Sequence, residues 1–179
     1  MKINFPTLLT ITRIILTVPM MICIFIESDA ARIAAIICFI IASVSDFIDG
    51  RLARKYHQVT KLGKFLDPLA DKMLVNLAFL ALVVLGAVPV WVFGIIIVRD
   101  LMVDGVRMMA ASNKVTIDAS KFGKAKTMLQ MITLALIMLN LIIQNDILSA
   151  INMTLLGFVV MLTVYSGFDY LIKAWKYLE

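Results

Sequence analysis

Residues 45–72 read SDFIDGRLARKYHQVTKLGKFLDPLADK and lie between two long apolar segments. Asp46 and Asp49 are three residues apart, so they would share one face of a helix. Asp67 and Asp71, four residues apart, would do the same. Ionisable side chains at or inside a membrane are costly to keep and mark a functional site by default. Two such faces turned toward each other would gather four carboxylates, the kind of oxygen cluster that Mg²⁺ or Mn²⁺ binds.

The composition predicts a membrane protein. The chain has 179 residues, of which 62% are hydrophobic, and a mean hydropathy of +0.99, whereas soluble domains are about 45–50% apolar. The apolar runs are too long and too frequent for a water-soluble core, so we expect an all-α polytopic membrane protein with one domain, residues 1–179, and no removable signal peptide. Six transmembrane helices are expected at about residues 5–26, 31–54, 65–86, 89–111, 122–143 and 147–172.

Capping and helix-breaking residues at the boundaries support these spans. They are Ser28 and Asp29 before the second span, Gly86 after the third, Pro89 in the first turn of the fourth, Asp118 and Ser120 before the fifth, and Asn145 and Asp146 before the sixth.

The distribution of basic residues predicts the orientation. Twelve of the 17 lysines and arginines fall on one side of the predicted bundle, whereas the opposite loops hold only Arg32. The positive-inside rule therefore places both termini in the cytoplasm and the chain in the cell (inner) membrane, with the active site facing the cytoplasm. The net charge of +5 reflects this topology and an anionic lipid surface. A nucleic-acid partner is not expected, because the basic residues are divided among short loops.

Small residues and one arginine share the helical stripes of the four aspartates. They are Gly50, Ala53 and Arg54 on the second span and Gly63 on the third. Small residues let a flat ligand approach the backbone closely. The planar guanidinium of Arg54 can bind a phosphate group through bidentate hydrogen bonds. Carboxylates for metal, small residues for a planar group and an arginine for phosphate together indicate a nucleotide diphosphate.

The pattern DxxDGxxARx8Gx3Dx3D, which covers residues 46–71, resembles the signature of the CDP-alcohol phosphotransferase family, and all eight fixed positions match. The family's known members are six-helix membrane enzymes. They displace CMP from a CDP-linked lipid or alcohol with a second alcohol. The resemblance implies the same reaction class for this chain, and a homodimer.

The resemblance also implies roles for single residues. One divalent ion, Mg²⁺ or Mn²⁺, would be held by Asp46, Asp49 and Asp67. A second would be held by Asp46, Asp67 and Asp71, with Asp71 also the candidate base. A covalent aspartyl intermediate is the alternative route. The cytidine pocket would be lined by Gly50, Ala53 and Gly63.

The likeness extends to the segments NFPTLLTITR (4–13), LGKFLDPLADK (62–72), GKAKT (123–127) and SGFDY (166–170), which are similar to the bacterial phosphatidylglycerophosphate synthases of this family. It implies CDP-diacylglycerol as the donor and sn-glycerol 3-phosphate as the acceptor. Another acceptor, an inositol phosphate or a second lipid, is the alternative within the class. A divalent-cation or carboxylate transporter is the alternative outside it, but the acids cluster at one end and no discontinuous helix repeats are evident.

Four cations are the candidates for binding the acceptor phosphate. Arg107, Lys124 and Lys121 lie near cytoplasmic helix ends, and Arg99 lies eight residues before Arg107 on the fourth span. The structural alternative for the two arginines is an ion pair with Asp100 or Asp104 on the same helix, where the similar synthases tend to have Glu and a neutral residue. The alternative for the lysines, including Lys126, is that they serve the positive-inside topology and contact anionic lipid.

Thr10 and Arg13 on the first span are the remaining candidates for donor binding. The alternative for Arg13 is that its side chain snorkels to the membrane surface.

Overall fold

Six α-helices and no strand form the part of the chain that the computed structural model describes, residues 5–55, 61–112 and 121–175. Side chains are described for residues 8, 10–45, 69–70, 72–110 and 122–172. The all-α class is therefore confirmed. The helices are α1 (Phe5–Phe25), α2 (Asp29–Lys55), α3 (Lys61–Val84), α4 (Val90–Ser112), α5 (Lys121–Ile143) and α6 (Asp146–Trp175).

The start of α6 follows the predicted capping residue. The side-chain oxygen Oδ1 of Asn145 accepts hydrogen bonds from the backbone N–H groups of Ile147 (2.9 Å) and Leu148 (3.1 Å). These are donors that the first turn of a helix otherwise leaves without a partner. Asp146 is the first residue of the helix, where its charge complements the helix dipole.

The turn between α3 and α4 depends on Gly86, which has a positive φ of 73° that favours glycine. The N–H of Gly86 donates to the carbonyl of Val83 (3.0 Å), and the N–H of Ala87 donates to that of Leu82 (2.9 Å). Pro89 directly precedes α4 rather than lying within its first turn, and its carbonyl accepts from the N–H of Val92 (3.1 Å). The predicted Asp118 and Ser120 lie outside the described residues.

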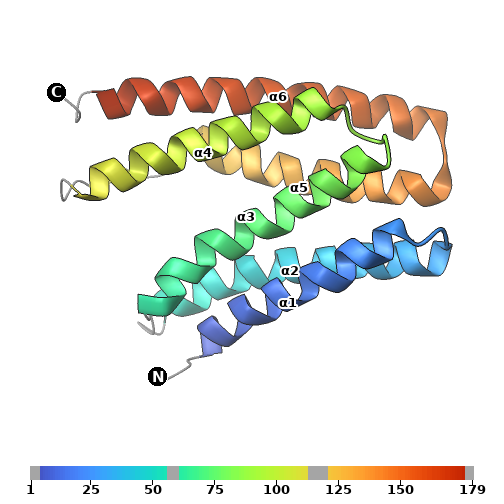
Figure 1. Ribbon diagram of the computed structural model, residues 1–179, viewed down its shortest axis with the longest axis horizontal. Coiled ribbons are helices and arrows are strands. Elements are labelled where there is room, and N and C mark those ends of the chain that lie inside the picture. Colours follow the sequence, from blue (N-terminus) through green and yellow to red (C-terminus); the bar gives the residue numbers. More distant parts are fainter. Residues whose placement is uncertain (1–4, 56–60, 113–120, 176–179) are drawn as a thin grey trace.

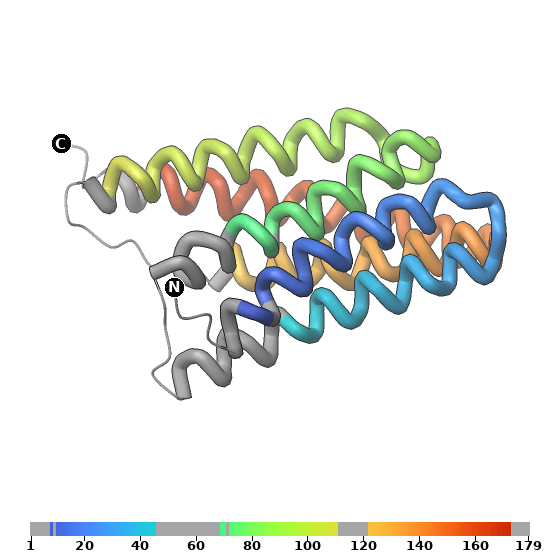
Figure 2. The backbone as a smooth tube through the Cα atoms, turned by 60° about the horizontal axis from the view of Figure 1, so that its bottom comes forward, coloured from blue at the N-terminus to red at the C-terminus, as the bar shows by residue number. Residues whose placement is uncertain are grey.

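Consecutive helices run in opposite directions, so the bundle has two distinct ends (Figure 1). We call the end at which α2 finishes and α3 begins the motif end, and the opposite end the far end. The helices α1, α2 and α3 pack together, and α6 packs against both α4 and α5. Contacts of α2 with α5, α3 with α4 and α3 with α5 join these two halves (Figure 2). At the far end, the Arg32 guanidinium on α2 donates to the carbonyl of Leu141 on α5 at 2.7 Å.

Large apolar side chains are exposed on all six helices, whereas several polar side chains are buried. Buried hydroxyls bond within their own helix, as Thr17 does to the carbonyl of Arg13 (2.9 Å) and Thr163 to that of Val159 (2.6 Å). Among the described residues, two helical segments are long and apolar enough to cross a membrane, Phe122–Ile143 and Asp146–Ile172. Shorter apolar segments occur in α1 and α3.

Candidate active site

The four aspartates of the motif lie on two packed antiparallel helices. Asp46 and Asp49 belong to α2, and Asp67 and Asp71 belong to α3. The helical backbone at these positions agrees with the predicted spacing of three and four residues, and it puts both pairs toward the motif end. Their side chains lie outside the described residues, so their role as metal ligands stays a prediction.

The predicted CDP-binding positions of the second and third helices occupy the same region of the backbone. Gly50, Ala53 and Arg54 fall in the last turns of α2, and Gly63 falls in the first turn of α3. The surroundings of these residues lie outside what the structure describes. The same holds for the side chain of Lys121, the first residue of α5.

Thr10 and Arg13 on α1 are both buried, with exposed fractions of 0% and 1%. An arginine that is 1% exposed does not extend to the surface, so the snorkelling alternative for Arg13 is wrong. Whether either residue binds the donor stays a prediction.

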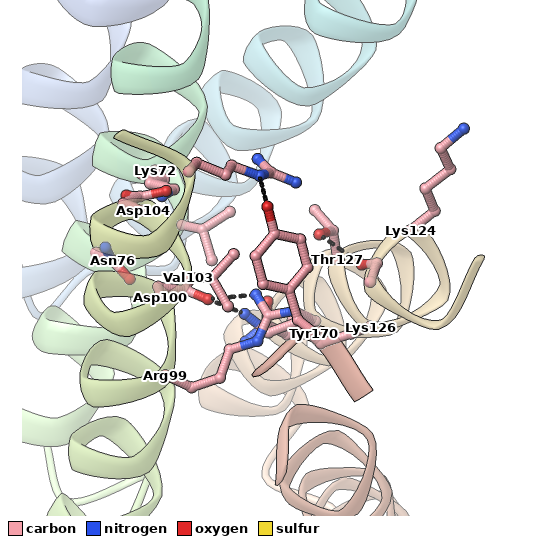
Figure 3. Close-up of a pocket in the computed structure, with 14 residues that line it drawn as sticks. Lys72, Asn76, Arg99, Asp100, Val103, Asp104, Lys124, Lys126, Thr127 and Tyr170 are labelled. Carbon is pink, nitrogen blue, oxygen red and sulfur yellow. Dashed lines mark hydrogen bonds and ion pairs between the residues drawn. The ribbon is translucent and has the colours of Figure 1, made fainter. Parts of the chain in front are cut away.

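A pocket of about 210 Å³ opens between α3, α4, α5 and α6 (Figure 3). In Figure 3, Lys72, Asn76 and Asp104 lie on one side of it, and Lys124, Lys126 and Thr127 lie on the other. Three of the predicted acceptor residues line the pocket: Arg99, Arg107 and Lys124. Its charged side chains comprise five cations and two carboxylates, an excess of three positive charges. We call it the cationic pocket.

Asp100 holds two of these cations. Its Oδ1 accepts hydrogen bonds from Arg99 Nη1 at 2.9 Å and from Lys126 Nζ at 2.6 Å. Arg99 also donates from Nη2 to the Ser166 hydroxyl on α6 at 3.1 Å. The structural alternative considered for Arg99, a pair with Asp100 on its own helix, is therefore present, and the cluster ties α4 to α5 and α6.

The second carboxylate, Asp104, forms an ion pair with Lys72 of α3. Lys72 directly follows Asp71 in the chain. The pair therefore connects the helix that carries the motif to α4. It also neutralises the charge of Asp104.

Arg107 does not pair with Asp104, as the structural alternative required. Its Nε donates to the hydroxyl of Tyr170 on α6 at 3.3 Å, and its guanidinium carbon lies 5.5 Å from the centre of the Tyr170 ring. Tyr170 is an uncharged partner, so this contact positions Arg107 at the pocket without neutralising the positive charge of its guanidinium.

The prediction did not include several residues that line the pocket. Lys126 was weighed between contact with the lipid surface and recognition of an anionic acceptor without being named as a site residue, and it is 2% exposed and faces Asp100. Asn76, Gln130 and Tyr170 were not singled out at all. The available signal was helical spacing, because Asn76 follows Lys72 by four residues and Gln130 follows Lys126 by four.

Comparison with known proteins identifies the family of this chain. A profile described as CDP-alcohol phosphatidyltransferase matches residues 3–165. The chain is 37% identical to a Rickettsia bellii protein named CDP-diacylglycerol--glycerol-3-phosphate 3-phosphatidyltransferase, over 97% of each chain. Proteins of the same name from Bacillus subtilis (36% identity, 98% of this chain and 97% of theirs) and Sodalis glossinidius (32% identity, 97% and 96%) are also similar. The chain belongs to the CDP-alcohol phosphatidyltransferase family.

Proposed function

We propose that this protein transfers the phosphatidyl group of CDP-diacylglycerol to sn-glycerol 3-phosphate, giving phosphatidylglycerol phosphate and CMP. One observation carries the proposal. The cationic pocket includes Lys72, the residue directly after Asp71 of the motif, so a pocket suited to a small anion shares the helix α3 with part of the motif. The names of the similar proteins state this donor and this acceptor.

The reaction needs a base and a leaving group. Asp71 would accept the proton of the acceptor hydroxyl, whose oxygen then attacks the phosphorus that carries the diacylglycerol. The bond between this phosphorus and the oxygen of CMP breaks, and CMP leaves with the electron pair. A base and a phosphate-binding pocket side by side would hold the two reactants in an attacking geometry.

Two divalent ions, Mg²⁺ or Mn²⁺, fit the donor set of the motif, because four carboxylates on two packed helices offer the oxygen ligands that these hard cations prefer. Asp46, Asp49, Asp67 and Asp71 would hold them, and the ions would neutralise the negative charge of the donor diphosphate. Beside them, Gly50, Ala53 and Gly63 would leave room for the cytidine, and Arg54, Thr10 and Arg13 would bind the rest of the donor head group.

The charge of the cationic pocket favours an anionic acceptor over a neutral one. Its three excess positive charges match a phosphate monoester, which carries about two negative charges at neutral pH. Arg107 and Lys124 are both exposed at the pocket and are not paired with a carboxylate among the described residues, so they are the primary candidates for the phosphate. Lys121 lies at the start of α5, and Asp100 holds Arg99 deeper in the pocket. Both cations would add to the positive electrostatic potential of the pocket.

The protein would act as a six-span enzyme of the cell membrane, with the motif end in the cytoplasm and a homodimer as its assembly. Exposed apolar side chains on all six helices and buried polar ones support insertion in lipid. Labelling of single introduced cysteines in a Cys23→Ser, Cys38→Ser background would test the orientation, because these are the only two cysteines.

The decisive experiment is an acceptor panel with purified protein, CDP-diacylglycerol and Mg²⁺. Glycerol 3-phosphate, inositol 1-phosphate, glycerol and a lipid alcohol would be compared by CMP release and by the mass of the lipid product. We expect CMP release with glycerol 3-phosphate and a product of the mass of phosphatidylglycerol phosphate. Preference for another acceptor would overturn the assignment of substrate while leaving the family unchanged.

A further inference from the structure

Two amide side chains line the cationic pocket with polar atoms that are buried and lack a hydrogen-bond partner among the described residues. They are Oδ1 of Asn76 on α3 and Nε2 of Gln130 on α5. Gln130 is 2% exposed. A buried polar atom without a partner is costly, and such atoms in native proteins call for an explanation. Here one unused atom is a hydrogen-bond acceptor and the other is a donor.

These amides lie one helical turn deeper than two of the lysines. Asn76 follows Lys72 on α3, and Gln130 follows Lys126 on α5, each by four residues. Because α3 and α5 both run from the motif end toward the far end, both amides lie on the far-end side of their lysines (Figure 1). Four residues span about 6 Å along a helix. On both α3 and α5, the amide therefore lies one turn farther from the motif end than the lysine.

We propose that Asn76 and Gln130 bind a non-reacting hydroxyl of a polyol phosphate and so determine which acceptor is used. A hydroxyl suits this pair of atoms, because its oxygen accepts from Gln130 Nε2–H while its own hydrogen is donated to Asn76 Oδ1. A carbonyl cannot donate to Asn76, and an ammonium cannot accept from Gln130. The same pocket thus offers cations for a phosphate and two amides for a hydroxyl of one small molecule.

This inference rests on the proposed function and adds the specificity of the same site. In glycerol 3-phosphate one hydroxyl attacks the donor, and the other, on the central carbon, takes no part in bond making. A site built to hydrogen-bond a hydroxyl discriminates against an analogue that lacks it, since the amides are then left unpaired. 3-Hydroxypropyl phosphate is that analogue, because it keeps the reacting hydroxyl and the phosphate and loses only the central hydroxyl.

The test compares both acceptors on wild type, Gln130→Met and Asn76→Leu, with CDP-diacylglycerol and Mg²⁺ in detergent. We expect wild type to prefer glycerol 3-phosphate in kcat/KM by about 10- to 100-fold. In each variant the preference should shrink to within about 3-fold of unity, through loss on glycerol 3-phosphate alone. The ratio is measured on one enzyme sample at a time, so it does not depend on the fraction that folds.

Asn152→Leu is the matched control. Asn152 is also a buried amide, 5% exposed, whose Oδ1 has no hydrogen-bond partner among the described residues, but it lines a separate cavity at the far end between α5, α6 and the turn from α3 to α4. This variant should keep the wild-type ratio even if its thermal stability falls.

A wild type that uses both acceptors equally, or Asn76 and Gln130 variants that keep the wild-type ratio, would overturn this inference and leave the proposed function standing. A wild type that releases no CMP with glycerol 3-phosphate would overturn both.

Discussion

The two halves of the bundle differ in how their functional residues are distributed along the chain. The half formed by α1, α2 and α3 carries the acidic motif within residues 46–71, on two consecutive helices joined by a short connection. The cationic pocket draws instead on α3, α4, α5 and α6, with lining residues from Lys72 to Tyr170. The difference suggests that the bond-breaking chemistry depends on local spacing, whereas recognition of the acceptor depends on how distant helices pack.

The largest expected effect is in the motif. Asp67→Asn should reduce turnover by at least about 1,000-fold, because Asp67 is proposed to contact both metal ions and an amide oxygen carries no charge. Steady-state CMP release by the detergent-purified variant is the measurement. Asp29→Asn at the far end, the same substitution in α2, is the control and should be as active as wild type. A folded Asp67→Asn enzyme with normal turnover would exclude the two-metal proposal.

Asp71→Asn should come next, with kcat lowered by about 100- to 10,000-fold and donor binding affected less than turnover. The reason is that a general base acts in the chemical step and contributes a factor of that size. Initial rates across a range of CDP-diacylglycerol concentrations separate the two parameters. If the donor KM rises while kcat stays normal, Asp71 belongs to donor binding and another group is the base.

Arg107→Ala tests the cationic pocket, whose lining residues come from four helices. The KM for glycerol 3-phosphate should rise by about 10- to 100-fold, the loss expected for a hydrogen bond between charged groups. The KM for CDP-diacylglycerol should not change. Initial rates measured over a matrix of both substrate concentrations provide both KM values. Arg107→Lys keeps the positive charge but loses the planar guanidinium, so its KM for glycerol 3-phosphate should lie between those of wild type and Arg107→Ala. Equal losses for both substrates would assign Arg107 a structural role.

Tyr170→Phe should have the smallest effect. It removes the hydroxyl that accepts from Arg107 Nε but keeps the ring beside the guanidinium, so the KM for glycerol 3-phosphate should rise by only about 2- to 5-fold. The same kinetic matrix measures it. A loss as large as that of Arg107→Ala would mean that the hydroxyl, rather than the ring, sets the position of the arginine.

Much of the fold follows from apolar runs and capping residues. All six expected spans correspond to helices, and Asn145 and Gly86 act at the ends predicted for them. The third helix begins at Lys61, four residues before the expected position 65, because its first turn is polar and an apolar run does not reveal it. That all six helices cross a membrane, and that the chain is one domain, stay predictions.

The site was only partly predictable from sequence. Basic residues of the fourth and fifth predicted spans indicated Arg99, Arg107 and Lys124, and these line one pocket. The partner of each was not predictable, since Lys126 reaches Asp100 from another helix and Tyr170 reaches Arg107 from a third. Such pairs depend on helix packing, which local spacing does not encode.

The hydrogen bond of Arg32 to the carbonyl of Leu141 has a mechanical consequence. It fastens the first turns of α2 to the last turns of α5 at the far end, where the short turn through Gly86 also joins α3 to α4. Two of the connections between the halves thus lie at the end opposite the motif, whereas the Lys72–Asp104 ion pair joins α3 to α4 nearer the motif. Under the proposed function, the head group of the lipid nucleotide would enter at the motif end, away from these far-end connections.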